Sequence, residues 1–329
     1  MIISKTPYRI SFFGGGSDFP SWHNKNYGLV ISTSINKFIY ISVRDMLNVF
    51  NIKYRLVYSK SEEVNNLNDI KHPVVPKLVK YLNYNNNFEI HYNGELPSQS
   101  GMGSSSAFVV GLMNAIINLK KNITKKELTY KSIYFEQKVL KESVGCQDHI
   151  CSIYGGLNTI EFFPGGAFKV NKLSENQNLI NLFKNNLFLY FTGIQRTSTR
   201  IIDTFINKIN NKKKDNVQKI VDIAVEAKKN FNLKSIDELG RLLHESWMVK
   251  KTLSSKISNS KIDDIYDYGI KYGALGGKVL GAGGGGFILF YVPKKNHKLF
   301  ESKLDNKLHR LKFDFEDKGS EIIFLKNDR

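Results

Sequence analysis

The segment 97–107, with the sequence PSQSGMGSSSA, constrains the fold of this chain more than any other feature. It connects an apolar run at Phe88–Tyr92, which we predict as a strand, to a longer apolar run that begins at Ala107. Gly101 and Gly103 allow the backbone to turn sharply and to approach a ligand closely. The three serines after them lie where a helix should begin, and the free N–H groups of a helix start favour an anion. The segment therefore predicts a phosphate-binding loop, although it lacks the lysine of a Walker loop.

The composition is typical of a globular protein. Hydrophobic residues make up 41% of the 329 positions, which is enough for two modest domains with cores of their own. No apolar run is long enough to cross a bilayer. The first residues, Met1–Lys5, lead directly into a predicted strand, so we expect no signal peptide, no membrane partner and a cytoplasmic location. The two cysteines, Cys146 and Cys151, lack zinc-site spacing and are expected to be buried thiols.

The formal net charge of +18 raises the question of a nucleic-acid partner. The lysines are dispersed, however, and their short runs lie beside asparagine-rich stretches, such as 83–87 and 207–216, that are typical of solvated loops. A general bias toward lysine, asparagine and isoleucine would raise the isoelectric point without any polyanion. We therefore expect no nucleic-acid partner, and a positive field that favours small anionic substrates.

The first half of the chain alternates predicted strands with turns. Apolar or alternating runs predict strands at Tyr8–Phe13, Leu29–Ile35, Phe38–Val43, Phe88–Tyr92 and Thr159–Phe163. The run Ala107–Leu119 is apolar on nearly every side and predicts a buried helix. A second helix is predicted over Lys125–Glu142 with Thr124 as its N-cap, and a short third helix over Asp148–Tyr154 after a break at Gly145.

The second half is richer in predicted helices. After a strand at Leu187–Phe191, helices are predicted at Ile201–Ile209, Val217–Phe231, Ile236–Leu253 and Lys261–Tyr272. The glycine-rich segment 276–286 then precedes a strand at Phe287–Val292, a helix near His297–Leu311 and a strand at Glu321–Leu325. A strand-rich half followed by a helix-rich half predicts an α+β fold with two lobes, and a boundary near Asn185 gives domains 1–185 and 186–329.

Two further glycine clusters are candidates for ligand binding. Gly281–Gly286 contains a G-x-G-x-x-G match, but the predicted strand follows the match instead of preceding it, which excludes a dinucleotide-binding turn. So many adjacent glycines indicate that a ligand or another backbone passes close by, and the alternative is a tight turn between strands. Gly14–Gly16 precede Ser17 and Asp18, whose side chains could hydrogen bond to vicinal hydroxyls of a sugar; the alternative is a turn capped by Asp18.

Glu136 and Asp148 lie on either side of the predicted break at Gly145. An isolated Glu136 would most often be solvated surface, and an isolated Asp148 would most often cap a helix. Near a phosphate-binding loop the same two carboxylates suggest another chemistry. One could bind Mg²⁺ while the other accepts a proton from an attacking hydroxyl.

Taken in order, the three glycine clusters resemble the motifs of the GHMP kinase family, which includes galactokinases, homoserine kinases and mevalonate kinases. The first motif is similar to 7–18. The second, Pro-x-x-x-Gly-Leu-Gly-Ser-Ser, matches 97–105 with Met102 in the leucine position, and the third, Lys-x-x-Gly-Ala-Gly-x-Gly-Gly, matches 278–286. The resemblance spans almost the whole chain and implies a strand-rich N-terminal lobe that binds ATP, with the active site in the cleft between the lobes.

The resemblance also implies roles for individual residues. The second motif would wrap the ATP phosphates through Pro97, Ser100, Gly101, Met102, Gly103, Ser104, Ser105 and Ser106. Ser105 and Glu136 match the family's Mg²⁺ ligands, and Asp148 matches the aspartate that faces the acceptor hydroxyl. Arg9 matches an arginine that can lower the pKa of that aspartate and stabilise charge on the transferred phosphoryl group.

On the substrate side, the resemblance implies contacts from Gly15, Gly16, Ser17, Asp18, Gly283 and Gly284. The third motif would pack against the phosphate-binding loop 97–107, called the phosphate loop from here on, and would close on the substrate. Arg196 is expected to contact a substrate phosphate, because arginine suits bidentate phosphate recognition; the alternative is a basic helix start. Arg200 ranks below Arg196 for this contact, and Lys25 and Lys278 are further candidates that the sequence does not rank. His149 and Trp247 are expected to pack or to support the site.

Gly14–Asp18 departs from the galactokinases and resembles the fucokinase and heptose-kinase branch. That branch implies transfer of phosphate from ATP to the anomeric hydroxyl of D-glycero-D-manno-heptose 7-phosphate, in the route to nucleotide-activated heptose for surface polysaccharide. Two alternatives stay open: a kinase for L-fucose or another hexose, and a nucleotide- or RNA-binding protein on the same fold. The expected cofactors are ATP and Mg²⁺, the expected partner is a small sugar phosphate, and a homodimer is left open.

Overall fold

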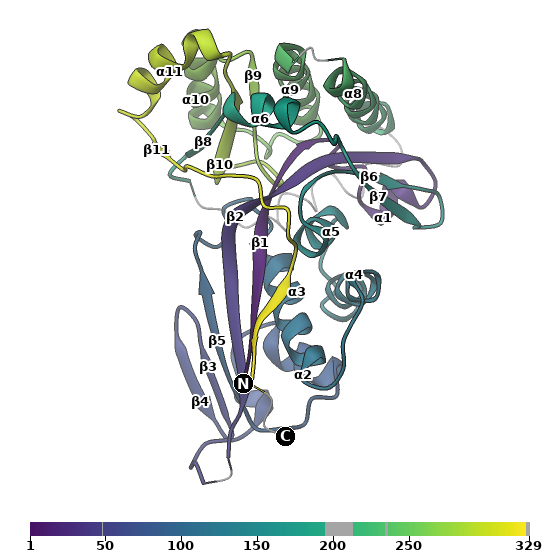
Figure 1. Cartoon of the computed structure of the whole chain (residues 1–329), viewed down its shortest axis with the longest axis vertical. Helices are drawn as coiled ribbons and strands as arrows, with labels where there is room; N and C mark the ends of the chain where they lie inside the picture. Colours follow the sequence, from purple (N-terminus) through teal and green to yellow (C-terminus); the bar gives the residue numbers. More distant parts are fainter. Residues whose placement is uncertain (48, 195–212, 234–235, 327–329) are drawn as a thin grey trace.

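The computed structural model describes residues 1–47, 49–194, 213–233 and 236–326. The predicted helix at Ile201–Ile209 and the candidate arginines Arg196 and Arg200 lie outside the described residues. Two β-sheets organise the described part of the chain. Figure 1 shows the first sheet below and the second above, with the long strands β1 (Ile2–Phe13) and β2 (Gly28–Asp45) extending toward the upper part.

The first sheet has eight strands in the order β12–β1–β2–β5–β3–β4, with β6 paired to β2 and β7 paired to β6. Its other strands are β3 (Tyr54–Val57), β4 (Ser61–Val64), β5 (Phe88–Gly94), β6 (Leu157–Phe162), β7 (Phe168–Lys172) and β12 (Glu321–Leu325). The first half of β2 pairs with β6 and the second half pairs with β5. The strands predicted at Leu29–Ile35 and Phe38–Val43 are therefore one strand, because a pairing irregularity opposite Pro7 and Tyr8 absorbs the two residues between them.

Four helices cover one face of this sheet: α2 (Val75–Tyr81), α3 (Ser104–Asn118), α4 (Lys125–Tyr134) and α5 (Gln147–Tyr154), as Figure 1 shows. The short helix α1 (Pro20–His23) follows the first glycine cluster. Helix α3 lies against β1 and β2 and is buried along almost its whole length, as its uniformly apolar sequence predicts. The predicted N-cap of α4 is confirmed, because the Thr124 side chain accepts a hydrogen bond from the Glu127 N–H.

The helix predicted over Lys125–Glu142 is wrong at its C-terminal end. Regular α-helix stops at Tyr134 and a single π-helical turn, Phe135–Val139, follows it. Lys141 has φ of +60°, a left-handed conformation that no right-handed helix can include, so the helical path ends before it. The π-helical turn carries Glu136, and such turns often occur at functional sites.

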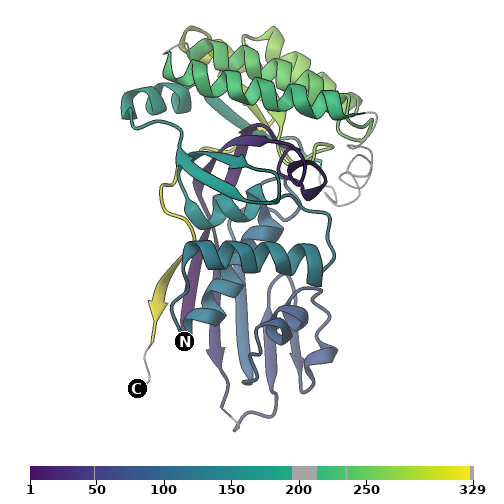
Figure 2. The ribbon, with the colours of Figure 1, turned by 90° about the vertical axis from the view of Figure 1, so that its right-hand side faces the viewer.

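The second sheet has four strands in the order β11–β8–β10–β9, which are β8 (Leu187–Phe191), β9 (Gly276–Val279), β10 (Phe287–Tyr291) and β11 (His309–Arg310). Its helices are α6 (Gln177–Asn185), α8 (Lys214–Asn232), α9 (Ile236–Lys251), α10 (Ser260–Lys271) and α11 (His297–Leu304). Figure 2 shows α8 and α9 side by side across the top of the molecule. The helix predicted near His297–Leu311 is too long, because the chain leaves α11 after Leu304 and pairs with β8 through β11.

Two observations show that the halves are not independent. Strand β12 returns to the first sheet and pairs with β1, so both ends of the described chain lie at the same end of the molecule (Figure 1). Phe183 stacks edge-on against Phe12 of β1, with ring centroids 5.1 Å apart, and against Phe231 of α8 at 5.5 Å. The division into domains 1–185 and 186–329 stays a prediction, and the strand at Glu321–Leu325 belongs to the sheet of the N-terminal half.

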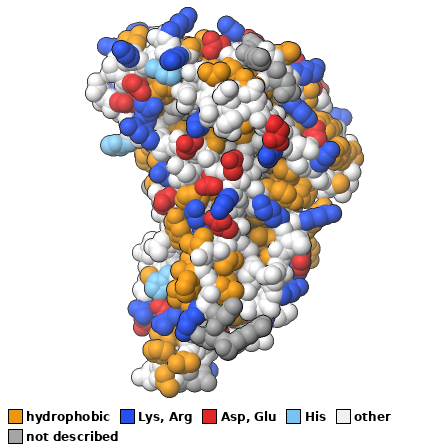
Figure 3. Space-filling model, in the orientation of Figure 1, with side chains coloured by type: hydrophobic (Ala, Val, Ile, Leu, Met, Phe, Trp, Pro, Cys, Tyr) orange, Lys and Arg blue, Asp and Glu red, His pale blue; other side chains and the backbone are white. Residues whose placement is uncertain are grey.

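The charged side chains are dispersed over the visible surface, as the sequence predicts. On the face seen in Figure 3, lysine and arginine side chains are interspersed with aspartate and glutamate. None of the described helices combines the length and the apolar character that a bilayer crossing requires. Cys146 and Cys151 are buried free thiols, as predicted, and burial raises the pKa of each to about 12, which makes them poor nucleophiles.

Candidate active site

A pocket opens where the phosphate loop, the end of β1, the start of α5 and the third glycine cluster meet. Its lining includes Arg9, Ser11, Gly15, Gly16, Asp18, Gly101, Gly103, Ser104, Ser105, Ser106, Gln147, Asp148, Lys250, Lys278, Gly281 and Ala282. The three clusters that are remote from one another in the sequence are thus neighbours in space. Three of the predicted phosphate-loop residues do not line the pocket: Pro97 is exposed, and Ser100 and Met102 are buried beneath the loop.

The phosphate loop ends in the first turn of α3, as the sequence predicts. Helix α3 begins at Ser104, and Gly103 occupies its N-cap position with φ of +77°, a conformation that favours glycine. The three serines therefore lie in the first helical turn, where backbone N–H groups have no partner within the helix. The helix dipole adds positive charge at the same point, which suits a phosphate.

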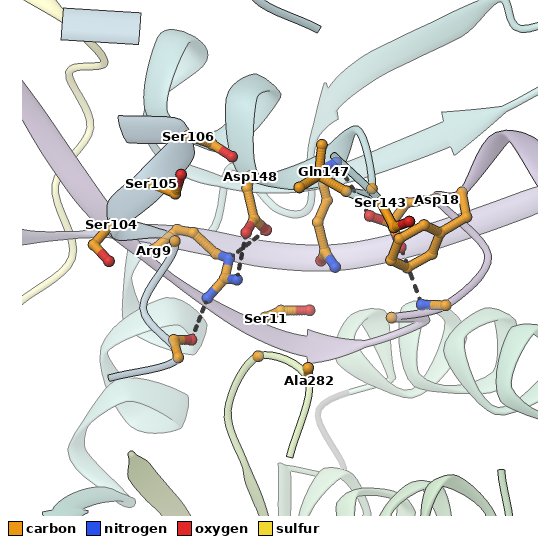
Figure 4. Close-up of a pocket in the computed structure, with 18 of the residues that line it drawn as sticks. Arg9, Ser11, Asp18, Ser104, Ser105, Ser106, Ser143, Gln147, Asp148 and Ala282 are labelled. Carbon is orange, nitrogen blue, oxygen red and sulfur yellow. Dashed lines mark hydrogen bonds and ion pairs between the residues drawn. The ribbon is translucent and has the colours of Figure 1, made fainter. Parts of the chain in front are cut away.

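Arg9 and Asp148 form a bidentate ion pair at the centre of the pocket (Figure 4). Arg9 Nε lies 2.7 Å from Asp148 Oδ1 and Nη2 lies 2.8 Å from Oδ2, while Nη1 donates to the Gly101 carbonyl at 2.8 Å. Burial lowers the pKa of Arg9, but the charge and hydrogen bonds of Asp148 outweigh burial and raise it overall. The helix-cap alternative for Asp148 is wrong, because α5 begins at Gln147 with Cys146 as its N-cap.

Glu136 is fully buried, so the alternative of a solvated surface residue is wrong. Ser105 Oγ donates to Glu136 Oε1 at 3.0 Å, and Ser106 Oγ donates to Oε2 at 2.7 Å. His149 Nε2 lies 2.7 Å from the same Oε2, and its ring is fully buried as well. The π-helical turn thus places a carboxylate directly under the first turn of α3, and His149, expected only to pack or to support the site, contacts it.

The spacing of Ser105 and Glu136 is compatible with two neighbouring ligands of a magnesium ion, although it is also that of the hydrogen bond between them and Glu136 does not line the pocket. Octahedral Mg²⁺ holds its ligands at about 2.1 Å, which places neighbouring ligand atoms about 3 Å apart. Ser105 Oγ and Glu136 Oε1 are separated by 3.0 Å. Among the described residues no group of three or more His, Cys, Asp or Glu side chains could hold a metal, so phosphate oxygens and water would supply the remaining ligands.

The third glycine cluster packs against the phosphate loop. A Cβ at Gly281 would lie 2.9 Å from the Gly101 backbone, and one at Gly286 would overlap the Ser100 carbonyl. The Phe287 N–H donates to that carbonyl at 3.1 Å. The predicted close approach of another backbone is therefore confirmed. Gly283 and Gly284, predicted to contact the substrate, instead approach Ile257 and do not line the pocket.

The first glycine cluster places Asp18 beside the start of α5. Asp18 is fully buried, and its carboxylate accepts hydrogen bonds from the Gly16 N–H at 3.0 Å and the Gln147 N–H at 3.3 Å. A Cβ at Gly145 would overlap this carboxylate, which explains the glycine before α5. Ser17, predicted to contact substrate, donates to the Gly14 carbonyl at 2.8 Å and does not line the pocket.

Burial, with a further contribution from the charge of Asp148, raises the pKa of Asp18 to about 6. A carboxylate with a raised pKa in the folded state contributes stability below its unfolded pKa, near 4, and that contribution is lost as the pH rises through about 6. Replacing Asp18 by Asn removes this dependence. We expect the difference in unfolding free energy, Asp18→Asn minus wild type, to increase by roughly 2 kcal/mol from pH 4 to pH 7.

Urea unfolding at several pH values measures this difference. Glu89→Gln provides a control of opposite sign: Glu89 is buried, yet its bonds to His91 and Arg44 outweigh burial and lower its pKa. The unfolding free energy of Glu89→Gln minus that of wild type should decrease from pH 4 to pH 7. If the difference in unfolding free energy between Asp18→Asn and wild type does not change with pH, the raised pKa of Asp18 is contradicted.

Two buried lysines from the C-terminal half reach the pocket: Lys278, which is a predicted candidate for a phosphate contact and begins the third motif, and Lys250, which no sequence pattern indicated. Lys250 of α9 donates to the Gly281 carbonyl, and Lys278 of β9 donates to the Phe12 carbonyl at 2.8 Å. Burial, together with the nearby charges of Lys250 and Arg9, lowers the pKa of Lys278 well below its ordinary value. An anion bound in this part of the pocket would stabilise the charged form of Lys278.

Ser11 and Gln147 also line the pocket, although neither was among the predicted site residues. A signal for each was present in the sequence. Ser11 is two residues beyond Arg9 on a strand, so the period of two places both on one face, and Gln147 precedes Asp148 directly. Figure 4 shows both side chains facing the same space as Asp148.

Comparison with known proteins agrees with this geometry. A model of the GHMP kinases N terminal domain matches residues 70–156, and a model described as GHMP kinases C terminal matches residues 227–309. Together they cover just over half of the chain. The first match contains the phosphate loop, Glu136 and Asp148, and the second contains the third glycine cluster.

Curated relatives extend the match to nearly the whole chain. The D-glycero-alpha-D-manno-heptose 7-phosphate kinase of Campylobacter jejuni is 28% identical over 313 residues, which is 92% of each protein. The bifunctional fucokinase/GDP-fucose pyrophosphorylase of Arabidopsis thaliana is 22% identical over 309 residues, which is 86% of this chain and 29% of that protein. The crystal structure of a D-glycero-D-manno-heptose 1-phosphate kinase from Bacteroides thetaiotaomicron shares the fold, with a TM-score of 0.80, 23% identity, and coverage of 99% of this chain and 100% of that one.

Proposed function

The chain belongs to the GHMP kinase family and is an ATP-dependent sugar kinase, and we propose that it phosphorylates D-glycero-D-manno-heptose 7-phosphate at the anomeric hydroxyl. The product would be the 1,7-bisphosphate, in the route to nucleotide-activated heptose for surface polysaccharide. The observation that carries the proposal is one pocket in which Asp148, held by Arg9, faces the space beside a helix-start phosphate loop.

In the proposed reaction, Asp148 accepts the proton of the anomeric hydroxyl. The freed oxygen forms a bond to the γ-phosphorus of ATP while the bond to the bridging oxygen breaks, and ADP leaves. An anomeric hydroxyl is more acidic than an ordinary alcohol, so an ionised carboxylate is an adequate acceptor. Arg9 fixes both oxygens of that carboxylate, and its link to the Gly101 carbonyl ties the base to the phosphate loop.

The phosphate loop supplies the electrostatic part of catalysis. The N–H groups in the first turn of α3 lie where charge on the β- and γ-phosphates would develop. Ser105 and Glu136 would hold Mg²⁺, which neutralises phosphate charge when bound. Ser106 and His149 hold the second oxygen of Glu136 and so orient the carboxylate toward Ser105.

A phosphorylated acceptor suits the charges of the pocket. Arg9 is paired with Asp148, but Lys278 makes no ion pair with a carboxylate among the described residues, and Lys250 lies beside it. A substrate that brings a phosphate of its own in addition to ATP would offset the burial that disfavours the charged form of Lys278. The contact predicted for Arg196 lies outside the described residues and stays a prediction.

A screen of ADP release over sugars tests the proposal. We expect D-glycero-D-manno-heptose 7-phosphate to exceed its dephosphorylated form in kcat/KM by about 100-fold, because charge-assisted contacts to a phosphate are lost with it. L-fucose and D-mannose belong in the same screen, since an Arabidopsis relative is named as a fucokinase. A preference for L-fucose, or equal rates with and without the 7-phosphate, would contradict the proposed acceptor. Steep salt-dependent RNA binding with no sugar turnover would instead favour the nucleotide- or RNA-binding alternative.

A further inference from the structure

We propose that Ser11 and Gln147 together bind the acceptor hydroxyl on the carbon next to the reacting one, and so select sugars that carry this hydroxyl. The proposal rests on the proposed function, because it assigns a role at the acceptor end of the same pocket. Both residues line that pocket, and neither belongs to the Arg9–Asp148 pair; Ser11 lies in the segment 7–18, but the resemblance implied no role for it.

The first observation is that both side chains have unused hydrogen-bonding capacity. Ser11 is only 4% exposed, and its Oγ has no hydrogen-bond partner among the residues that the structure describes. Within the same described part of the chain, Gln147 Oε1 is also buried without a partner. A buried polar atom without a partner costs free energy, so its presence in a ligand pocket indicates that a ligand supplies the missing hydrogen bond.

The second observation is that both side chains face one small space. A Cβ built at Gly15 would lie 3.7 Å from Gln147 Nε2 and 3.8 Å from Ser11 Oγ. A side chain at position 15 would therefore fill the gap between the two polar groups. Figure 4 shows Gln147 and Ser11 on facing sides of this gap, with Asp148 adjacent.

The third observation is the position of the gap relative to the reaction. Gln147 precedes Asp148 on α5, and its backbone N–H donates to Asp18 at 3.3 Å. The gap thus lies between the carboxylate that faces the reacting hydroxyl and the buried carboxylate of the first glycine cluster. A sugar whose reacting hydroxyl contacts Asp148 would present its neighbouring hydroxyl to this gap.

The chemistry of the pair suits a hydroxyl. A hydroxyl donates one hydrogen bond and accepts others, and both the serine hydroxyl and the glutamine amide can donate and accept. Two such groups on opposite sides of a hydroxyl fix its direction. They would reject a sugar that lacks this hydroxyl, because both would then stay unpaired.

Kinetic assays that combine protein variants with modified acceptors test the role of Ser11 and Gln147. Wild type, Ser11→Ala and Gln147→Met are each assayed with an acceptor and its 2-deoxy analogue. The acceptors are D-glycero-D-manno-heptose 7-phosphate, D-mannose and L-fucose. We expect wild type to prefer the hydroxylated acceptor by about 10- to 100-fold in kcat/KM, and each variant to lose most of this preference while its KM for ATP is unchanged. The ratio of kcat/KM for the acceptor to kcat/KM for its 2-deoxy analogue is measured with one protein preparation. A fraction of misfolded protein lowers both values equally and does not change the ratio.

Ser152→Ala is the matched control. Ser152 is also a buried serine on α5 whose Oγ has no partner in the described ranges of the chain, but it does not line the pocket. Its variant should keep the wild-type ratio. Variants of Ser11 and Gln147 that keep the ratio, or that slow both acceptors equally, would overturn the proposal. If wild type uses L-fucose instead of the heptose phosphate, the proposed function fails, and the ratio measured with L-fucose still decides the role of the pair.

Discussion

Asp148→Asn is expected to reduce kcat by about 1,000-fold, within the range that a positioned general base contributes, while the affinity for ATP stays near that of wild type. The amide is nearly the same size as the carboxylate but cannot accept a proton at neutral pH. In the proposed reaction the ATP phosphates contact the phosphate loop, and Arg9 Nη1 donates to the Gly101 carbonyl separately from the bonds that Nε and Nη2 make to Asp148. Chemistry is therefore lost and nucleotide binding is kept.

Steady-state turnover and a direct measurement of nucleotide binding separate these two effects. Asp305→Asn is a suitable control, because Asp305 accepts a hydrogen bond from the Tyr190 hydroxyl at 2.6 Å and does not line the pocket. That variant should remain within about twofold of wild type. Near-wild-type turnover in Asp148→Asn would remove Asp148 from the role of base, and loss of ATP binding would show that it mainly supports the loop.

Glu136→Gln is expected to raise the Mg²⁺ concentration for half-maximal activity by about 100-fold, because metal affinity depends strongly on ligand charge and on ligand orientation. The substitution keeps the shape of the side chain but removes the negative charge that faces Ser105 Oγ at 3.0 Å. It also removes one acceptor from the group formed by Ser105, Ser106 and His149. We expect a loss of about 1–3 kcal/mol in unfolding free energy from the unpaired buried groups.

Titration of activity with Mg²⁺ at saturating substrates measures the first effect, and urea unfolding measures the second. Glu89→Gln is the matched control: Glu89 of β5, like Glu136, is a buried carboxylate that does not line the pocket, but its partners are Arg44 and His91 instead of the serines at the start of α3. It should lose stability without a change in Mg²⁺ dependence. If Glu136→Gln lowers activity with the Mg²⁺ dependence of wild type, Glu136 only braces the phosphate loop and does not bind the metal.

Much of the fold followed from local patterns. The strand at Leu187–Phe191 and the strand at Glu321–Leu325 have the predicted bounds, and the buried helix begins at the predicted serines. The errors lie where long-range pairing or an unusual backbone conformation decides. Two predicted strands form the single strand β2, and the helix after Thr124 changes to a π-helical turn at Phe135. Neither a bulge nor a π-helical turn has a distinctive period in the sequence.

The candidate site was predictable in its motifs but not in its contacts. Arg9 and Asp148 are 139 positions apart, and their ion pair depends on how α5 lies against β1. Lys250 occurs in a stretch that is typical of an ordinary helix, whereas Lys278 begins the third motif, and only the packing of the second sheet on the first brings both to the pocket.

The phosphate loop 97–107 illustrates the division between sequence and tertiary structure. Its glycines and serines determined locally that the backbone turns sharply and starts a helix, because conformational freedom and helix capping act over a few residues. Tertiary structure alone decided what surrounds that helix start. Glu136 below it, Gly281 and Gly286 against it, and Asp148 across from it come from separate parts of the chain. Burial and close packing bring these residues together, and both forces depend on the whole fold rather than on neighbouring residues.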